Sequence, residues 1–133
     1  MQKISVQTSG EGFYDITATI KTRVPPKKSG ILTIFCPHTS CGLTLNEACD
    51  PSACDDMVSF LKHLAPRNLS FIRHTAEGPD DSPSHMKSML LQHSIQIIVE
   101  NGELIMGRWQ GLWLAEFRDA PHERHLILKF MEG

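Results

Sequence analysis

The second half of the sequence contains the pattern that most restricts the fold. The segment SIQIIVE, residues 94–100, is followed by Asn101 and Gly102 and then by ELIMG, residues 103–107. An Asn-Gly pair between apolar segments is a strong signal for a tight β-hairpin, because both residues tolerate positive φ. Two further apolar segments are GLWLAEFR at 111–118 and HLILKF at 125–130. This part of the chain therefore predicts antiparallel strands.

The first half contains three more predicted strands. They are KISVQT at 3–8, which ends before Gly10 and Gly12, ILTIFC at 31–36 and GLTLNEA at 42–48. The segment DITATIKTRV, residues 15–24, fits two structures. Ile16, Ala18 and Ile20 have the period of a strand, whereas Ile16, Ile20 and Val24 fit one face of a helix with Asp15 as its N-cap. Pro25 and Pro26 end the segment in either case.

Two helices are predicted between these strands. The first begins at Asp50 and Pro51, ends before Pro66, and has a core-facing stripe of Cys54, Met57, Val58, Leu61 and Leu64. The second is SPSHMKSMLLQ, residues 82–92, with Ser82 as N-cap and Pro83 in the first turn; it is expected to bury Met86, Met89 and Leu90.

Strands and helices are interspersed without a βαβα rhythm. We therefore predict an α+β fold with a largely antiparallel sheet and two to three helices. The 133 residues have the length of one domain, 1–133, and no repeat or low-complexity tract divides them. A chain of this size buries roughly two-thirds of the surface that it exposes when unfolded, so one hydrophobic core is sufficient.

Charge and hydropathy exclude several classes of protein. The chain has 13 Lys and Arg against 15 Asp and Glu, a net charge of -2, and no basic stripe, so we expect no nucleic-acid partner. The apolar runs are far shorter than the ~20 residues that cross a bilayer, and MQKISVQTSG lacks the apolar region of a signal peptide. We therefore expect no membrane partner and a cytoplasmic location.

Four cysteines lie close together, Cys36, Cys41, Cys49 and Cys54, and no two of them form a CxxC pair. In a reducing compartment a free cysteine behaves as a small hydrophobe, so we expect reduced and partly buried thiols. The alternative is a thiolate zinc site, although the spacing is not that of a zinc ribbon or finger.

Three of the seven histidines lie next to polar clusters, namely His38, His74 and His85. His85 is expected in the first turn of its helix, where the helix dipole favours a neutral, ligating imidazole. The loop before it carries Glu77, Asp80 and Asp81, and Asp81 can orient a histidine. Alternatively, Asp80 and Asp81 only favour the start of the helix. The other four histidines are expected in structural or solvated positions: His63, His93, His122 and His125.

The segment GRWQGLWLAEFR, residues 107–118, suggests a second polar constellation. Strand alternation places Leu112, Leu114, Glu116 and Arg118 on one face and Trp113, Ala115 and Phe117 on the other. Glu116 and Arg118 then pair across a site or form an ordinary surface ion pair. Arginines are suited to bidentate phosphate contacts, but no glycine-rich phosphate loop accompanies Arg73, Arg108 and Arg124.

Five motifs occur in the order found in one family. They are HTSCGLTLNE, RH at 73–74, EGPDDSPSHMKSMLL, GRWQGLWLAEFR and HERHLILKFMEG. With these motifs the sequence resembles the YjbQ-like family of small proteins, also known as secondary thiamine-phosphate synthases. The likeness covers nearly the whole chain. It implies a compact α+β fold, a homotrimer and a polar, metal-binding site where the histidine motifs meet.

The resemblance also implies roles for individual residues. It indicates His38, His74 and His85 as metal ligands, and Asn46, Glu47 and Asp50 as further site residues. Catalytic or substrate-orienting positions are Asp81, Trp109, Gln110, Glu116 and Arg118, and Thr39 and Ser40 would hold the loop of His38 or the substrate. Many relatives have histidine where this chain has Phe117, so any ligand at that position is lost here.

Three functions are compatible with these expectations. The first is a metal-assisted transferase that joins a hydroxymethylpyrimidine pyrophosphate to a thiazole phosphate and releases pyrophosphate, with Arg73, Arg118 and Arg124 near the phosphates. The second is a metal-dependent hydrolase of a small phosphorylated compound, with Glu47 or Asp81 as base. The third is a trimeric metal- or ligand-binding protein without enzymatic activity. Three histidines suit zinc, whereas pyrophosphate release usually employs magnesium, so the divalent cation is either.

Overall fold

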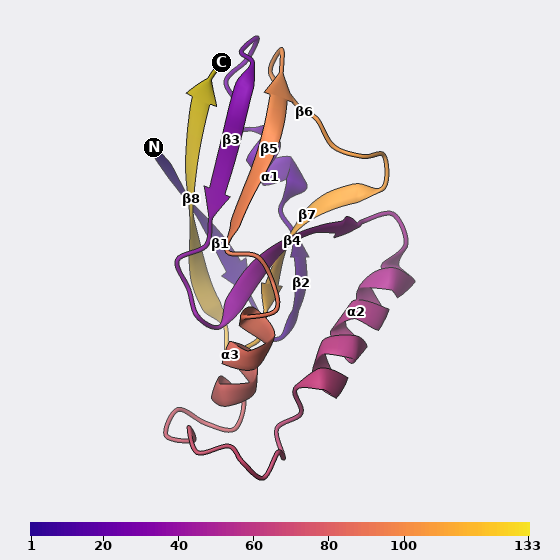
Figure 1. The fold of residues 1–133 in the computed structure, drawn as a ribbon, viewed down its shortest axis with the longest axis vertical. Coiled ribbons are helices and arrows are strands. Elements are labelled where there is room, and N and C mark those ends of the chain that lie inside the picture. The colour runs from indigo at the N-terminus through magenta and orange to yellow at the C-terminus, as the bar shows by residue number, and fades with distance from the viewer.

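Eight strands form two antiparallel sheets in the computed structural model, which describes residues 1–133 (Figure 1). Sheet A has the strand order β1-β8-β3-β5-β6 and sheet B has the order β2-β7-β4. The strands of sheet A are β1 (Gln2–Thr8), β3 (Gly30–Phe35), β5 (Ser94–Glu100), β6 (Glu103–Leu104) and β8 (His122–Glu132). Those of sheet B are β2 (Gly12–Asp15), β4 (Cys41–Glu47) and β7 (Gln110–Glu116). The predicted α+β class with largely antiparallel sheets is confirmed.

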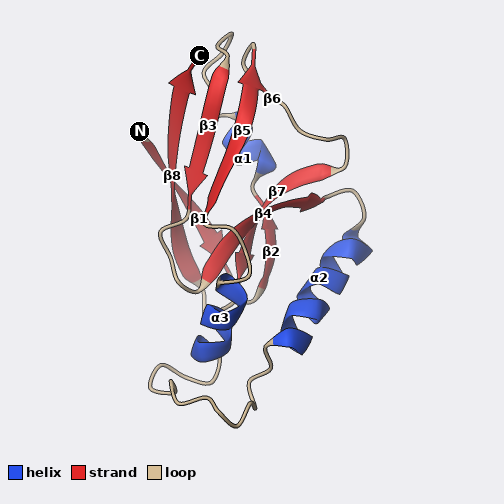
Figure 2. Cartoon of the chain, viewed as in Figure 1, coloured by secondary structure: helices blue, strands red, loops and turns tan.

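Three helices accompany the sheets: α1 (Thr17–Lys21), α2 (Pro51–Leu64) and α3 (Asp81–Ser88) (Figure 2). Figure 1 shows α2 and α3 at the same end of the molecule, connected by the long loop of residues 65–80. The predicted start of α2 is confirmed, since the Asp50 carboxylate accepts a hydrogen bond from the Ser52 main-chain N–H at 2.9 Å. No helix is long and apolar enough to span a bilayer.

The hydrophobic core lies between the two sheets. In β5 alternate residues are buried, Ile95, Ile97 and Val99, and they belong to one cluster with Leu112 and Leu114 of β7. Each fully buried aliphatic side chain of this kind stabilises the fold by roughly 1.5–3 kcal/mol. The alternating apolar residues from which the strands were predicted are thus the residues that fill the core.

The predicted hairpin after β5 is confirmed, but its second strand is shorter than expected. Asn101 and Gly102 have φ values of 50° and 81°, as a type I′ turn requires. The strand ends at Leu104, with one further main-chain hydrogen bond from Ile105 N–H to the Ile98 carbonyl; the chain then turns at Gly107, whose N–H donates to Gln110 Oε1, and enters sheet B. The predicted strand 103–107 is therefore wrong beyond Leu104.

Within residues 15–24 only Thr17–Lys21 follow the helical alternative, and Ile16 takes the N-cap position predicted for Asp15. Asp15 Oδ1 accepts the main-chain N–H of Thr17 at 2.9 Å at the start of α1, and Ile16, Ile20 and Val24 are buried. Gly12–Asp15 form the short strand β2, which the sequence did not predict.

The apolar faces predicted for α2 and α3 are only partly right. Leu61 of α2 is buried, but Leu64 is exposed. α3 starts at Asp81 and ends at Ser88, which leaves Met89 76% and Leu90 56% exposed instead of buried. The buried positions of α3 are polar, because Ser88 donates to the Cys41 carbonyl at 2.7 Å and Lys87 donates to Glu11 at 2.7 Å. Such satisfied polar groups can occupy a buried face.

Candidate metal centre

Two imidazoles and one carboxylate meet at the start of α3, and we call His74, Asp81 and His85 the His–Asp centre. One ligand atom from each lies within 4.8 Å of the others. His74 Nε2 is 2.6 Å from Asp81 Oδ2, and His85 Nε2 is 3.2 Å from the same oxygen. Asp81 and His85 share a helix face because they are four residues apart, while His74 comes from the loop before the helix.

The tautomer of His85 is fixed by a backbone carbonyl. His85 Nδ1 is 2.8 Å from the carbonyl oxygen of Thr39, which can only accept, so Nδ1 is the donor. In the neutral ring Nε2 then keeps its lone pair, and this lone pair faces Asp81 Oδ2. At 3.2 Å either a proton on Nε2, which makes His85 a cation that donates to Asp81, or a metal ion can lie between the two atoms. The donor set of two histidines and one carboxylate therefore fits a divalent metal ion, in particular zinc.

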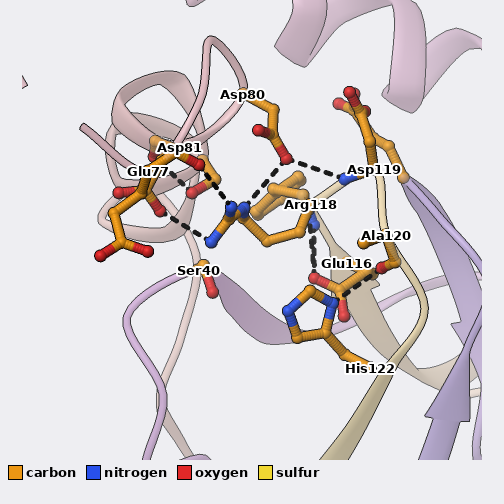
Figure 3. A network of polar contacts seen from close by, with 12 residues as sticks. Ser40, Glu77, Asp80, Asp81, Glu116, Arg118, Asp119, Ala120 and His122 are labelled. Carbon is orange, nitrogen blue, oxygen red and sulfur yellow. Dashed lines mark hydrogen bonds and ion pairs between the residues drawn. The ribbon is translucent and has the colours of Figure 1, made fainter. Parts of the chain in front are cut away.

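Arg118 orients the carboxylate of the centre (Figure 3). Its Nη1 is 2.9 Å from Asp81 Oδ1, its Nε donates to Asp80 Oδ2 at 2.9 Å, and its Nη2 donates to the Glu77 carbonyl at 3.1 Å. Asp81 Oδ2 is thereby left to the two imidazoles. Burial opposes ionisation of Asp81, but the hydrogen bond from His74 and the charges of His85 and Arg118 outweigh it and lower the pKa of this carboxyl.

The centre is open on its histidine side. The side chains of His74 and His85 are 54% and 38% exposed, whereas that of Asp81 is only 5% exposed. A catalytic zinc site typically has three protein ligands and one position for water or substrate. An ion bound here would thus have a buried, oriented carboxylate on one side and access to solvent on the other.

A cavity of about 630 Å³ lies beside His85. Its lining contains no carboxylate, lysine or arginine and consists of Phe35, Cys36, Pro37, His38, Thr39, His85, Ser88, Met89 and His93. Sequence reasoning missed His93, because it extended the second helix to Gln92. α3 ends at Ser88 instead, and the Ser88 hydroxyl, which lies 3.1 Å from His93 Nε2, brings this ring to the cavity.

His38 was predicted as the third ligand and does not join the centre within this chain. Its Nε2 accepts the main-chain N–H of His125 in β8 at 3.0 Å. The β3–β8 ladder ends at the pair Phe35 and Ile127. Beyond it, the His125 N–H bonds to the His38 ring instead of to a residue of β3. Burial and the charge of Arg124 lower the pKa of His38, which favours the neutral, accepting ring.

Glu116 and Arg118 do not pair with one another, contrary to prediction. Glu116 is fully buried, and its oxygens accept from Arg124 Nη2 at 2.6 Å, from Arg124 Nε at 2.7 Å and from Thr8 Oγ1 at 2.7 Å. Arg124 also donates to Ser40 Oγ at 2.8 Å. The predicted catalytic role of Glu116, the predicted phosphate contact of Arg124 and the predicted role of Ser40 in holding the His38 loop or the substrate thus fall on groups already satisfied inside the protein.

The remaining predicted site residues lie at the opposite end of sheet B. Glu47 ends β4 and pairs with Gln110 of β7, while the loop of His38 precedes Cys41 at the other end of β4. Seven residues of strand separate these ends by about 20 Å. The far end comprises Asn46, Glu47, Asp50, Trp109 and Gln110. The expectation that Asn46 and Glu47 line the pocket of His38 is wrong for a single chain.

Two predicted phosphate-binding arginines differ in their surroundings. Arg108 lies over the ring of Trp109, with its guanidinium carbon 4.6 Å from the ring centroid, at the far end of sheet B. Arg73 precedes His74 and is exposed to solvent. Of the arginines predicted to contact phosphate, Arg73 is therefore the one next in sequence to a residue of the His–Asp centre.

Comparison with known proteins identifies the family. A family model described as "UPF0047 protein YjbQ-like" matches residues 2–133. The chain belongs to the YjbQ-like UPF0047 family. It is 41% identical to UPF0047 protein YjbQ of Salmonella typhimurium over 127 residues, which cover 93% of this chain and 91% of that protein. It is 42% identical to UPF0047 protein YugU of Bacillus subtilis over 126 residues, which cover 93% and 92%.

Solved structures of this YjbQ-like family have the same fold. The conserved hypothetical protein TT1486 from Thermus thermophilus superimposes with a TM-score of 0.90 at 36% identity, covering 98% of this chain and all of that one. A YjbQ/UPF0047 family protein from Clostridium acetobutylicum gives a TM-score of 0.87 at 34% identity with the same coverage. These similarities confirm the family and the fold predicted from the five motifs.

Proposed function

We propose that this YjbQ-like protein is a metal-dependent enzyme that acts on a small phosphorylated compound, with the cation held by His74, Asp81 and His85. One observation carries the proposal: with His85 Nδ1 held by the Thr39 carbonyl, the ligand atoms of His74, Asp81 and His85 all lie within 4.8 Å of one another. A divalent cation at this position supplies Lewis acidity toward a phosphoryl oxygen or a water molecule.

The residues around the centre have separate tasks in this proposal. Asp81 contributes the negative charge that holds the cation, and Arg118 keeps its carboxylate turned toward the imidazoles. Exposed Arg73 binds a phosphate of the substrate from the solvent side. The adjacent cavity, whose lining is uncharged apart from its imidazoles, takes the organic part of the substrate.

The family resemblance supports the transferase reaction as the first candidate. The protein would join a hydroxymethylpyrimidine pyrophosphate to a thiazole phosphate and release pyrophosphate. The second candidate is hydrolysis of a phosphorylated compound, and the ligand set favours it, because two histidines and a carboxylate with an open position are the ligands of zinc hydrolases. The pairing of Arg118 and Arg124 with carboxylates also leaves fewer arginines for a pyrophosphate group.

The test compares product release with and without metal. Protein stripped by a chelator is reloaded with zinc or magnesium and given both thiamine precursors, or one phosphomonoester alone. Pyrophosphate release that needs both precursors and a metal supports the transferase, and phosphate release from the single ester supports the hydrolase. His63→Ala, on the exposed part of α2, is the matched control for His85→Ala. Metal binding without either product leaves a binding protein and contradicts the enzyme.

We also propose a homotrimer in the cytoplasm, as the resemblance and the free thiols suggest. All four cysteines are free, which fits a reducing compartment. Light scattering of the purified protein tests the trimer, since a mass of 14.9 kDa would contradict it.

Mixing His85→Ala with Glu47→Ala protein tests whether the two ends of sheet B form one site between chains. Regained activity in the mixture supports a shared site, and no gain contradicts it.

A further inference from the structure

Two buried thiols lie in contact, and one of them lines the cavity beside His85. Cys36 follows β3 and Cys41 begins β4, and their Sγ atoms are 3.5 Å apart. A disulfide requires a separation of about 2.05 Å, so the sulfurs need to approach by about 1.5 Å to form the bond. The other two cysteines differ, because Cys49 is exposed and Cys54 is half-buried.

Cys36 is the one of the two thiols that lines the cavity. Its sulfur contacts the Cys41 thiol and accepts a hydrogen bond from the main-chain N–H of His38, and the charge of Arg124 also favours its thiolate, whereas burial opposes ionisation. These contacts lower the pKa of Cys36, whereas the same thiol contact and burial raise the pKa of Cys41. The 630 Å³ cavity gives a small oxidant a path to the Cys36 sulfur.

The segment between the two thiols contacts the metal centre. The Thr39 carbonyl accepts the hydrogen bond from His85 Nδ1 at 2.8 Å, and the Cys41 carbonyl accepts from Ser88 Oγ at 2.7 Å. Two points of this segment therefore hold α3, the helix that carries Asp81 and His85. A covalent bond between Cys36 and Cys41 would move the carbonyl that fixes the tautomer of His85.

We propose that Cys36 and Cys41 form a reversible disulfide that weakens cation binding at the His–Asp centre; its effect on the cation rests on the function proposed above. With hydrogen peroxide as oxidant, Cys36 sulfur takes one oxygen atom, giving a sulfenic acid and one water. Cys41 sulfur then attacks Cys36 sulfur, forms the S–S bond and releases the second water. A small thiol restores both cysteines by thiol–disulfide exchange.

The expected change in zinc affinity can be judged from the hydrogen bonds that orient metal-binding histidines. Loss of such a contact typically lowers metal affinity about 10–100-fold, and the disulfide shifts one contact without removing the ligand. We therefore expect about tenfold weaker zinc binding in the oxidised protein. Reduction should restore the original affinity, because no ligand atom has been changed.

The experiment uses the Cys49→Ser/Cys54→Ser variant, so that Cys36 and Cys41 are the remaining thiols. The protein is oxidised with hydrogen peroxide, and non-reducing peptide mass spectrometry maps the bond. Zinc affinity is then measured against a chromophoric chelator before oxidation, after oxidation and after reduction. The matched control adds Cys36→Ser to the same background, and its zinc affinity should be the same in all three states.

Two results would overturn the proposal. One is the absence of a Cys36–Cys41 bond under conditions that oxidise Cys49 in the wild-type chain. The other is a mapped bond with a change in zinc affinity of less than about twofold, which would exclude the coupling. Failure of the reduced protein to bind zinc would contradict the proposed function and the coupling, while the peptide map would still decide whether the disulfide forms.

Discussion

Two charged clusters lie near one another in this protein and differ in how their hydrogen bonds are satisfied. Glu116 is fully buried, and Arg124, Thr8 and main-chain N–H groups supply every contact that its oxygens need. The His–Asp centre is instead half open, and the 3.2 Å contact between His85 Nε2 and Asp81 Oδ2 has room for either a proton or a metal ion. Both contain residues that motif reasoning placed in the site. The state of their hydrogen bonds, and not the residue types, separates the structural cluster from the candidate functional one.

The largest expected effect is on the buried cluster. Glu116→Gln leaves the buried guanidinium of Arg124 without a counter-charge, so the free energy of unfolding should fall by about 3–5 kcal/mol. Urea denaturation followed by circular dichroism measures it. The double variant Glu116→Gln/Arg124→Met should lose less than the sum of the two single variants. A loss below about 1 kcal/mol in the single variant would show that this ion pair is not structural.

The same glutamate predicts a pH dependence of stability. Burial opposes ionisation of Glu116, but the hydrogen bonds from Arg124 and Thr8 outweigh it and lower the pKa of its carboxyl below the usual 4.5. A lowered folded-state pKa stabilises the protein above pH 4.5, and this contribution is lost as the pH falls through the folded-state value. Denaturation midpoints measured between neutral pH and acid should therefore fall more steeply for wild type than for Glu116→Gln.

The next largest effect is a loss of zinc affinity that distinguishes a histidine of the His–Asp centre from a histidine elsewhere. His85→Ala removes a ligand atom, which should cost more than the 10–100-fold typical of an outer contact, so zinc affinity should fall by about 100-fold or more. Calorimetric titration with zinc measures it, and His63→Ala should bind zinc as wild type does. Unchanged zinc binding by His85→Ala would remove the proposed centre.

A smaller effect is expected where the two clusters meet. Arg118→Gln keeps all three ligands but releases Asp81 Oδ1, so we expect about tenfold weaker zinc binding. The loss should be smaller in a His85→Ala background, because the carboxylate then has one imidazole fewer to face. Full additivity of the two substitutions would contradict an orienting role for Arg118.

The smallest effect should come from an exposed ion pair. Arg67 and Asp119 form a bidentate contact of 2.6 and 2.7 Å, but both side chains are largely accessible to solvent. Asp119→Asn should therefore change the free energy of unfolding by less than about 1 kcal/mol, and salt should reduce even this difference. Urea denaturation at two ionic strengths measures it, and a loss as large as that of Glu116→Gln would erase the contrast between buried and exposed pairs.

Sequence reasoning succeeded where the determining interactions are local. Strand alternation, the Asn101-Gly102 turn and the Asp50 cap each depend on a few adjacent residues. The spacing of Asp81 and His85 on one helix is local as well. The resemblance added the family and the fold, which the comparisons confirm.

Partner choice across the fold was not predictable in the same way. Arg118 comes two residues after Glu116, just past the end of β7, yet each pairs elsewhere, because the turn between β7 and β8 brings Arg124 back to Glu116. The Thr39 carbonyl that fixes His85 is 46 residues away in sequence. His93 was missed because α3 ends four residues before the predicted helix end, and no local stop signal marks Ser88.

The ring of His38 has a consequence for the main chain of β8. It accepts the N–H of His125, which lies 87 residues later, just beyond the last residue that pairs with β3. The exchange of this single amide hydrogen with deuterated solvent is therefore slowed by a side chain and not by a neighbouring strand. An alanine in place of His38 would speed exchange at His125 while the amides of the β3–β8 ladder keep their protection.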